Sequence, residues 1–225
     1  MSQLTSVIKR AGPSLHSATV IFLHGLGDSG HGWEPIATEI GEIMKHVKFV
    51  LPNAPIRPIT INMGMRMPGW FDLTTLNLDQ IDGGVDEDGV METLSQIKKL
   101  IKDEIDSGIV SNRIVVGGFS QGAAIALATG VTSEYPLAGI VGLSGFLSME
   151  EKIIQMSTQA NKNTPIFMAH GDRDMVVNYK FGKRTSEFLK NNGYNVTFKT
   201  YNGMGHSSSN QEVYDLTSFL KQVIP

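Results

Sequence analysis

A serine, an aspartate and a histidine follow one another along the second half of the chain, each after a short apolar run: Ser120, Asp174 and His206. These side-chain types can turn an alcohol into a nucleophile. An imidazole takes the proton of the hydroxyl, and a carboxylate holds that imidazole in the correct tautomer and stabilises its charged form. The chemistry that such a trio supports is acyl transfer through a covalent ester on the serine.

The serine is the best marked of the three. Ser120 is the centre of a G-x-S-x-G motif, residues 118–122, which follows the apolar run 113–116 and precedes small residues typical of a helix. Small flanking residues let strand and helix approach closely, so the hydroxyl stands clear at a helix N-terminus. An ordinary Gly-Ser turn is the alternative. Ser144 is the weaker candidate, because Phe146 stands where the motif has its second glycine.

The acid and the base are selected by their order along the chain, since the acid follows the serine and the histidine comes last. His206 lies in a Gly-rich loop after the run 196–201 and is predicted to be the general base, a solvated loop histidine being the alternative. Asp174 is predicted to be the acid, with Asp172 as its competitor. His170 is predicted to shape the loop that carries the acid.

A Gly-rich loop, residues 25–30, matches the G-x-G-x-x-G dinucleotide fingerprint. That function needs an acidic residue at the end of the next strand, where residues 52–55 read Pro-Asn-Ala-Pro, so the dinucleotide interpretation is rejected. A hydrolase uses a loop in this place to present one oxyanion donor. The backbone N–H groups of Leu26 and Gln121 are therefore predicted to form an oxyanion hole, and His24 to brace the loop.

A Met-rich segment contains the candidates for substrate contact. Met63, Met65 and Met67 share one face if the segment is extended. Methionine is flexible and adapts to irregular apolar shapes. Together with Trp70 and Phe71, these residues are predicted to line a groove for a long acyl chain. Core packing under a long loop is the alternative.

The elements that must position these residues alternate between short strands and helices. Apolar runs rich in β-branched residues end in Gly, Pro, Asn or Ser, which is typical of strands buried on both faces. These runs are residues 19–23, 47–51, 113–116, 138–143, 165–168 and 196–201. Residues 86–107 show helical spacing, and capping boxes are predicted at Ser148 and Ser209. The fold class predicted is α/β, with a mostly parallel central sheet flanked by helices on both faces.

Length and composition limit the classes of function that are possible. The 225 residues fit a single domain, 1–225, and a net charge of −3 gives no basic surface for nucleic acid. The chain contains no cysteine, which excludes disulfides, cysteine metal ligands and S-acylation of the chain itself. No cluster has metal-ligand spacing, so neither a metal nor a cofactor is predicted. No apolar run is long enough to span a membrane, and the N-terminus lacks a signal peptide, so a soluble intracellular protein is expected.

With these residues in view, nearly the whole chain resembles the cytosolic acyl-protein thioesterases, also described as lysophospholipases or small carboxylesterases. The resemblance is carried by FLHGLGDSGHGW (22–33), PNAP (52–55), MPGWFD (67–72), GGFSQG (117–122), HGDRD (170–174) and GHSS (205–208). It implies an α/β-hydrolase fold without a large cap domain, and the same triad and oxyanion residues. It also implies that the Met-rich segment, at about 56–80, is a lid-like loop over an acyl groove.

The resemblance implies hydrolysis of S-palmitoyl-cysteine thioesters on proteins, with lysophospholipids and small esters as further substrates. The resemblance implies a cytoplasmic location, with the nucleus left open, and transient contact with a membrane surface is also left open. A homodimer is left open too, since an exposed Met-rich loop could pair with a second copy. Ala123 departs from the glycine common in the family, and Met204 before Gly205 also departs from the usual pattern. A lysophospholipase or short-chain carboxylesterase is the alternative activity, and a non-enzymatic hydrolase-fold binding protein is the alternative class.

Overall fold

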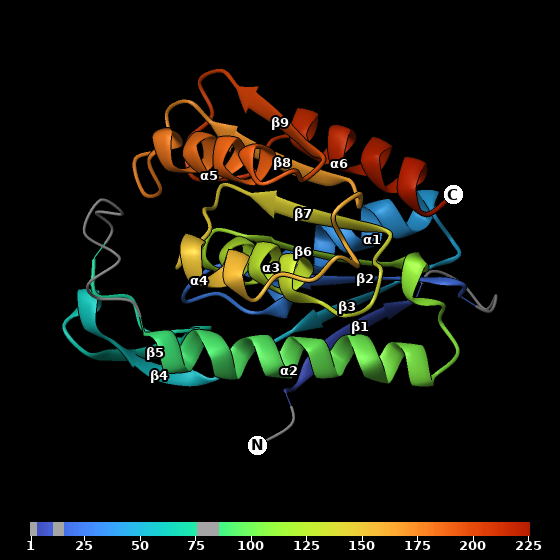
Figure 1. Ribbon diagram of the computed structural model, residues 1–225, viewed down its shortest axis with the longest axis horizontal. Coiled ribbons are helices and arrows are strands. Elements are labelled where there is room, and N and C mark those ends of the chain that lie inside the picture. Colours follow the sequence, from blue (N-terminus) through green and yellow to red (C-terminus); the bar gives the residue numbers. More distant parts are fainter. Residues whose placement is uncertain (1–3, 11–15, 76–85) are drawn as a thin grey trace.

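A seven-stranded sheet forms the centre of the molecule, in the order β1-β3-β2-β6-β7-β8-β9 (Figure 1). The computed structural model describes residues 4–10, 16–75 and 86–225. The strands are β1 (Ser6–Arg10), β2 (Ala18–Leu23), β3 (Val47–Pro52), β6 (Ile114–Phe119), β7 (Gly139–Leu143), β8 (Ile166–Gly171) and β9 (Val196–Tyr201). Strand β1 pairs antiparallel with β3, and all other pairs are parallel. The carboxyl ends of β2, β6, β7, β8 and β9 therefore meet at one edge.

Helices cover both faces of the sheet (Figure 1). The α-helices of the described residues are α1 (Glu34–Ile43), α2 (Glu87–Asp106), α3 (Gln121–Thr132), α4 (Glu150–Gln155), α5 (Tyr179–Asn191) and α6 (Asn210–Val223). Short 3₁₀ helices add η1 (Gly30–Trp33), η2 (Thr60–Asn62) and η4 (Ser111–Arg113). Side chains alternate along β2, so Val20 and Phe22 pack with α1 and α6, whereas Ile21 and Leu23 pack with α2 and α3.

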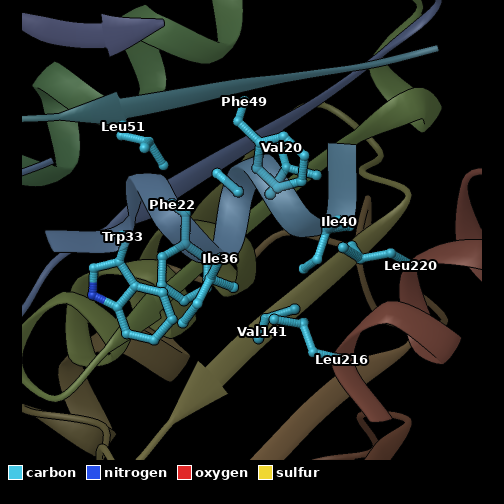
Figure 2. A pocket seen from close by; sticks show the side chains of 11 residues that line it. Val20, Phe22, Trp33, Ile36, Ile40, Phe49, Leu51, Val141, Leu216 and Leu220 are labelled. Carbon is cyan, nitrogen blue, oxygen red and sulfur yellow. The ribbon is translucent and has the colours of Figure 1, made fainter. Parts of the chain in front are cut away.

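The core between α1, α6 and the sheet contains a small apolar pocket (Figure 2). Trp33 and Ile40 meet Phe49 from β3 and Leu216 from α6 there. The cavity volume is about 10 Å³, and its lining is almost wholly apolar. A space of that size holds at most one water, which would find no polar partners. The pocket is therefore a packing feature.

The mostly parallel sheet with helices on both faces is confirmed, and each predicted run overlaps a strand, with the first residue of 113–116, 138–143 and 165–168 just before it. Strand β1 lies outside the predicted runs. The hairpin of β4 (Ile56–Ile59) and β5 (Met65–Pro68), which forms a separate two-stranded sheet, lies outside them too. Pro58 lies within β4 and hides the strand pattern, since proline cannot donate to a ladder. The predicted lid-like loop at 56–80 is described only as far as residue 75, and residues 76–80 lie outside the described residues. A single domain over 1–225 stays a prediction.

One of the two predicted capping boxes is wrong and the other is half formed. At α4 the N-cap is Met149, with φ of 53°, and the buried Ser148 hydroxyl has no hydrogen-bond partner among the described residues. At α6 the Ser209 hydroxyl accepts a hydrogen bond from the Glu212 N–H at 3.2 Å. The Glu212 carboxylate does not complete the box, because it is fully buried and neither oxygen meets a partner among the described residues.

The buried Glu212 makes stability depend on pH. Burial, and then the charge of Asp215, raises the pKa of Glu212 to about 8. A carboxyl whose pKa is raised by folding contributes its full stability below its unfolded value, near 4.5, and that stability is lost as the pH rises to about 8. We expect Glu212→Gln to flatten this decline by a few kcal/mol, as measured by urea unfolding between pH 5 and 9.

The exposed Glu92 of α2 provides the matched control, and Glu92→Gln should leave the pH dependence of unfolding unchanged. If the unfolding free energy fell equally steeply with pH in the wild type and in Glu212→Gln, Glu212 would not be the cause of the decline.

Candidate active site

Ser120 occupies a strained turn between β6 and α3. Its φ is 54°, in the left-handed region, and its N–H donates to the Leu143 carbonyl at 2.9 Å. A side chain at Gly118 would place its Cβ 2.4 Å from the Gly122 backbone, and one at Gly122 would place its Cβ 2.3 Å from the Leu23 carbonyl oxygen. Both motif glycines are thus required by close backbone contact, as the sequence motif predicts.

The three side chains grouped by the sequence meet at the carboxyl edge of the sheet. His206 Nε2 lies 3.0 Å from Ser120 Oγ, and His206 Nδ1 lies 2.7 Å from Asp174 Oδ2. The acid and the histidine follow β8 and β9, while the serine follows β6. This arrangement lets the imidazole take the hydroxyl proton while the carboxylate accepts a hydrogen bond from the Nδ1–H group.

The Asp174 carboxylate is fully buried and surrounded by donors. Its Oδ1 accepts hydrogen bonds from the N–H groups of Val176 at 2.9 Å and Val177 at 2.8 Å. Its Oδ2 faces His206, and His170 Nε2 lies 3.3 Å from the same oxygen. Burial alone would raise the pKa of Asp174, but the hydrogen bonds from His170, His206 and Val176 hold it well below its usual value. The acid therefore stays ionised.

The competing acid, Asp172, has a different position. Its Oδ1 accepts the Gly203 N–H at 2.6 Å, which fastens the loop that carries His206. The Arg173 N–H donates to the Met204 carbonyl at 3.0 Å and ties the same two loops together. The His206 ring also packs against the ring of Phe119, with the two centroids 4.8 Å apart.

The Gly-rich loop after β2 is braced by His24. The ring Nδ1–H donates to the Gly25 carbonyl at 2.7 Å, and Nε2 accepts the Ala54 N–H at 3.0 Å. Both ring nitrogens are thus occupied by backbone groups, which leaves neither free to act as a second base, and burial lowers the pKa of His24 and favours the neutral ring. The predicted oxyanion residues, Leu26 and Gln121, line one cavity together with Ser120 and His206.

Trp70 and Phe71 were expected in an acyl groove, and that prediction is wrong. Both side chains lie in the core, 0% and 1% exposed. The Trp70 N–H donates to Gln121 Oε1 at 2.9 Å, and Gln121 Nε2 donates to the Phe71 carbonyl at 2.7 Å. The Trp70 indole Nε1–H donates to the His24 carbonyl at 2.8 Å. These residues therefore connect the predicted oxyanion loop to the serine turn, and they are not among the residues that line the cavity beside Ser120.

The three methionines do not share one face. Met63 lies outside β5 with φ of 56° and is 94% exposed, whereas Met65 and Met67 are two residues apart within the strand. Met67 is half-buried, and its sulfur accepts a hydrogen bond from Asn62 Nδ2 at 3.3 Å. None of the three lines the cavity beside Ser120. Their contact with an acyl chain stays a prediction.

The cavity beside the serine has a volume of about 330 Å³ and a largely apolar wall. Its apolar lining is Leu26, Ile61, Leu73, Phe119, Phe146, Val176 and Val177. Ile61, Leu73 and Phe146 were not predicted, because they come from different segments of the chain and belong to no motif. Among the described residues, no cluster of His, Asp and Glu has the arrangement of a metal site. No helix among the described residues is long and apolar enough to cross a bilayer.

Comparison with known proteins gives matches over nearly the full length. The family model for phospholipase/carboxylesterase matches residues 5–224. Acyl-protein thioesterase 1 of Mycosarcoma maydis is 49% identical, over 93% of this chain and 92% of the relative. The crystal structure of SOBER1 from Arabidopsis thaliana is similar with a TM-score of 0.86 at 33% identity, over 92% of this chain and 99% of that one. Acyl-protein thioesterase 2 of Zea mays has a TM-score of 0.83 at 29% identity, over 98% and 99%.

The two hydrogen bonds of the Gln121 side chain to the backbone of Trp70 and Phe71 can be tested by mutation. Gln121→Met keeps the backbone N–H but leaves the Trp70 N–H and the Phe71 carbonyl without their partners. Each buried group left unpaired should cost about 1–3 kcal/mol of unfolding free energy. Misplacement of the loop should lower esterase kcat/KM roughly 10- to 100-fold.

Gln96→Met on α2 is the control, since within the described part of the chain the Gln96 side chain makes a single hydrogen bond, of 3.4 Å, to Glu92. Full activity and stability in Gln121→Met would show that the two bonds are dispensable.

Proposed function

The chain belongs to the phospholipase/carboxylesterase family, and from this premise we propose that it is a serine hydrolase that cleaves long-chain acyl thioesters, such as S-palmitoyl-cysteine, on proteins. One observation carries the proposal: His206 bridges Ser120 and Asp174 with contacts of 3.0 Å and 2.7 Å. Relatives named acyl-protein thioesterase 1, at 41–49% identity, support the choice of substrate.

The reaction proceeds in two halves. Ser120 Oγ attacks the thioester carbonyl carbon as His206 Nε2 takes the hydroxyl proton, and the carbonyl oxygen becomes an oxyanion bound by the N–H groups of Leu26 and Gln121. Collapse breaks the C–S bond, and the departing sulfur receives the proton from His206. Water then attacks the acyl-serine with His206 as base, which releases the fatty acid and restores the hydroxyl.

The binding of a long acyl chain rests on the wall of the cavity. The residues beside Ser120 are mainly apolar and come from the loops after β2, β4, β5, β6, β7 and β8, so a chain attached to the reacting carbonyl has apolar surface on several sides. The description of the family as phospholipase/carboxylesterase keeps lysophospholipids and small esters as alternative substrates. Transient contact with a membrane surface and a cytoplasmic location belong to the same proposal, which cell fractionation tests.

A substrate panel tests the function. We expect a palmitoyl thioester on a peptide to exceed the acetyl thioester of the same peptide by about tenfold or more in kcat/KM, because each buried CH₂ contributes about 0.8 kcal/mol. A lysophospholipid and a short aryl ester in the same panel separate the alternative activities. Ser120→Ala should lower kcat on the order of 10⁴-fold or more.

Ser144→Ala is the matched control, because Ser144 also follows a strand with a positive φ of 48°. Equal rates for acetyl and palmitoyl substrates would rule out the acyl-chain proposal. Full activity in Ser120→Ala would rule out the serine mechanism.

A further inference from the structure

A second imidazole lies against the acid of the candidate site. His170, near the end of β8, is fully buried. Its Nε2 lies 2.8 Å from the Val177 carbonyl oxygen, and because a carbonyl only accepts, Nε2 carries the hydrogen. The same nitrogen lies 3.3 Å from Asp174 Oδ2, the oxygen that receives His206. The Nε2–H thus donates to the backbone carbonyl, and the same nitrogen lies within ion-pair distance of the carboxylate.

The orientation of this ring is fixed by packing. His170 Nδ1 is buried and has no hydrogen-bond partner among the described residues. A Cβ on Gly182 of α5 would lie 2.3 Å from that nitrogen, so the glycine makes room for the ring. Tyr179 meets the ring edge-on, with centroids 6.0 Å apart. A buried polar atom left unpaired is costly, and it is retained here in a ring whose other nitrogen faces the acid.

We propose that His170 is a positioning residue that shares Asp174 Oδ2 with His206 and thereby sets the pH range in which His206 acts as a base. The proposal rests on the serine-hydrolase function proposed above. A carboxylate oxygen with a second N–H group close to it has less charge available for the imidazolium beside it. Removal of that donor strengthens the attraction between Asp174 and protonated His206, so the active, deprotonated form requires a higher pH.

Other ionisable groups near these rings have limited influence. The neighbouring elements bring Asp172, Arg173, Tyr179, Lys180, Lys199 and Tyr201. Asp172, Arg173 and Lys180 are exposed to solvent, which screens their charge, and Lys199 pairs with Asp215 at 2.9 Å. Tyr201 donates its hydroxyl to Asp215 as well. Asp174 is therefore the charged group in contact with both imidazoles.

The experiment is the pH profile of kcat/KM for a soluble ester in His170→Leu, which removes the donor, and His170→Gln, which retains one. We expect the acid limb of His170→Leu to move upward by roughly 0.5 to 1 pH unit, about the effect of one hydrogen bond, and that of His170→Gln to return toward the wild type. Gly182→Ala, which pushes a methyl group onto Nδ1, should move the limb in the same direction and carries the test if His170→Leu does not fold.

His46 provides the control, because its Nε2 also bonds a backbone carbonyl, that of Ile224, at 3.0 Å. His46→Leu should leave the acid limb in place. An unmoved limb in both His170→Leu and Gly182→Ala, with only stability or overall rate reduced, would overturn the proposal. An inactive wild type would instead overturn the proposed hydrolase function, so the two failures are distinguishable.

Discussion

The contact between the Ser120 hydroxyl and the His206 imidazole, at 3.0 Å, is the interaction on which the other features of the site depend. The two residues are separated by 86 positions in sequence, and only the parallel sheet brings them together. Because β6, β8 and β9 run in the same direction, the loops after all three strands meet at one edge. Strand direction therefore brings the catalytic residues to the same edge, and the conformations of the loops set the distances between them.

Those details are fixed by buried polar bonds. Gln121, Trp70 and His24 form a chain of hydrogen bonds from the serine turn to the predicted oxyanion loop. Asp172 and Asp174 fasten the two loops that carry the acid and the base. When a buried polar group loses its hydrogen-bond partner, the free energy of unfolding falls by a sizeable part of its total. The same hydrogen bonds therefore stabilise both the site and the fold.

The sequence was informative where chemistry restricts residue type. The G-x-S-x-G turn needs glycine at 118 and 122 on steric grounds, and strand ends supply the acid and base in a fixed order. It was uninformative where apolar residues have two uses. Trp70 and Phe71 fit a groove or a core equally well by residue type, and only the burial of their side chains, 0% and 1% exposed, distinguishes the two. The cavity wall could not be predicted, because its residues are apolar, carry no periodic pattern and come from separate loops.

A crystal structure of the protein after reaction with an alkyl fluorophosphonate tests the account most directly. The reagent forms a covalent bond with an activated serine, and its phosphonyl oxygen takes the place of the oxyanion. We expect one adduct, on Ser120, with that oxygen about 2.7–3.1 Å from the N–H groups of Leu26 and Gln121. An adduct on another residue, no adduct at all, or an oxygen directed away from both amides would contradict it.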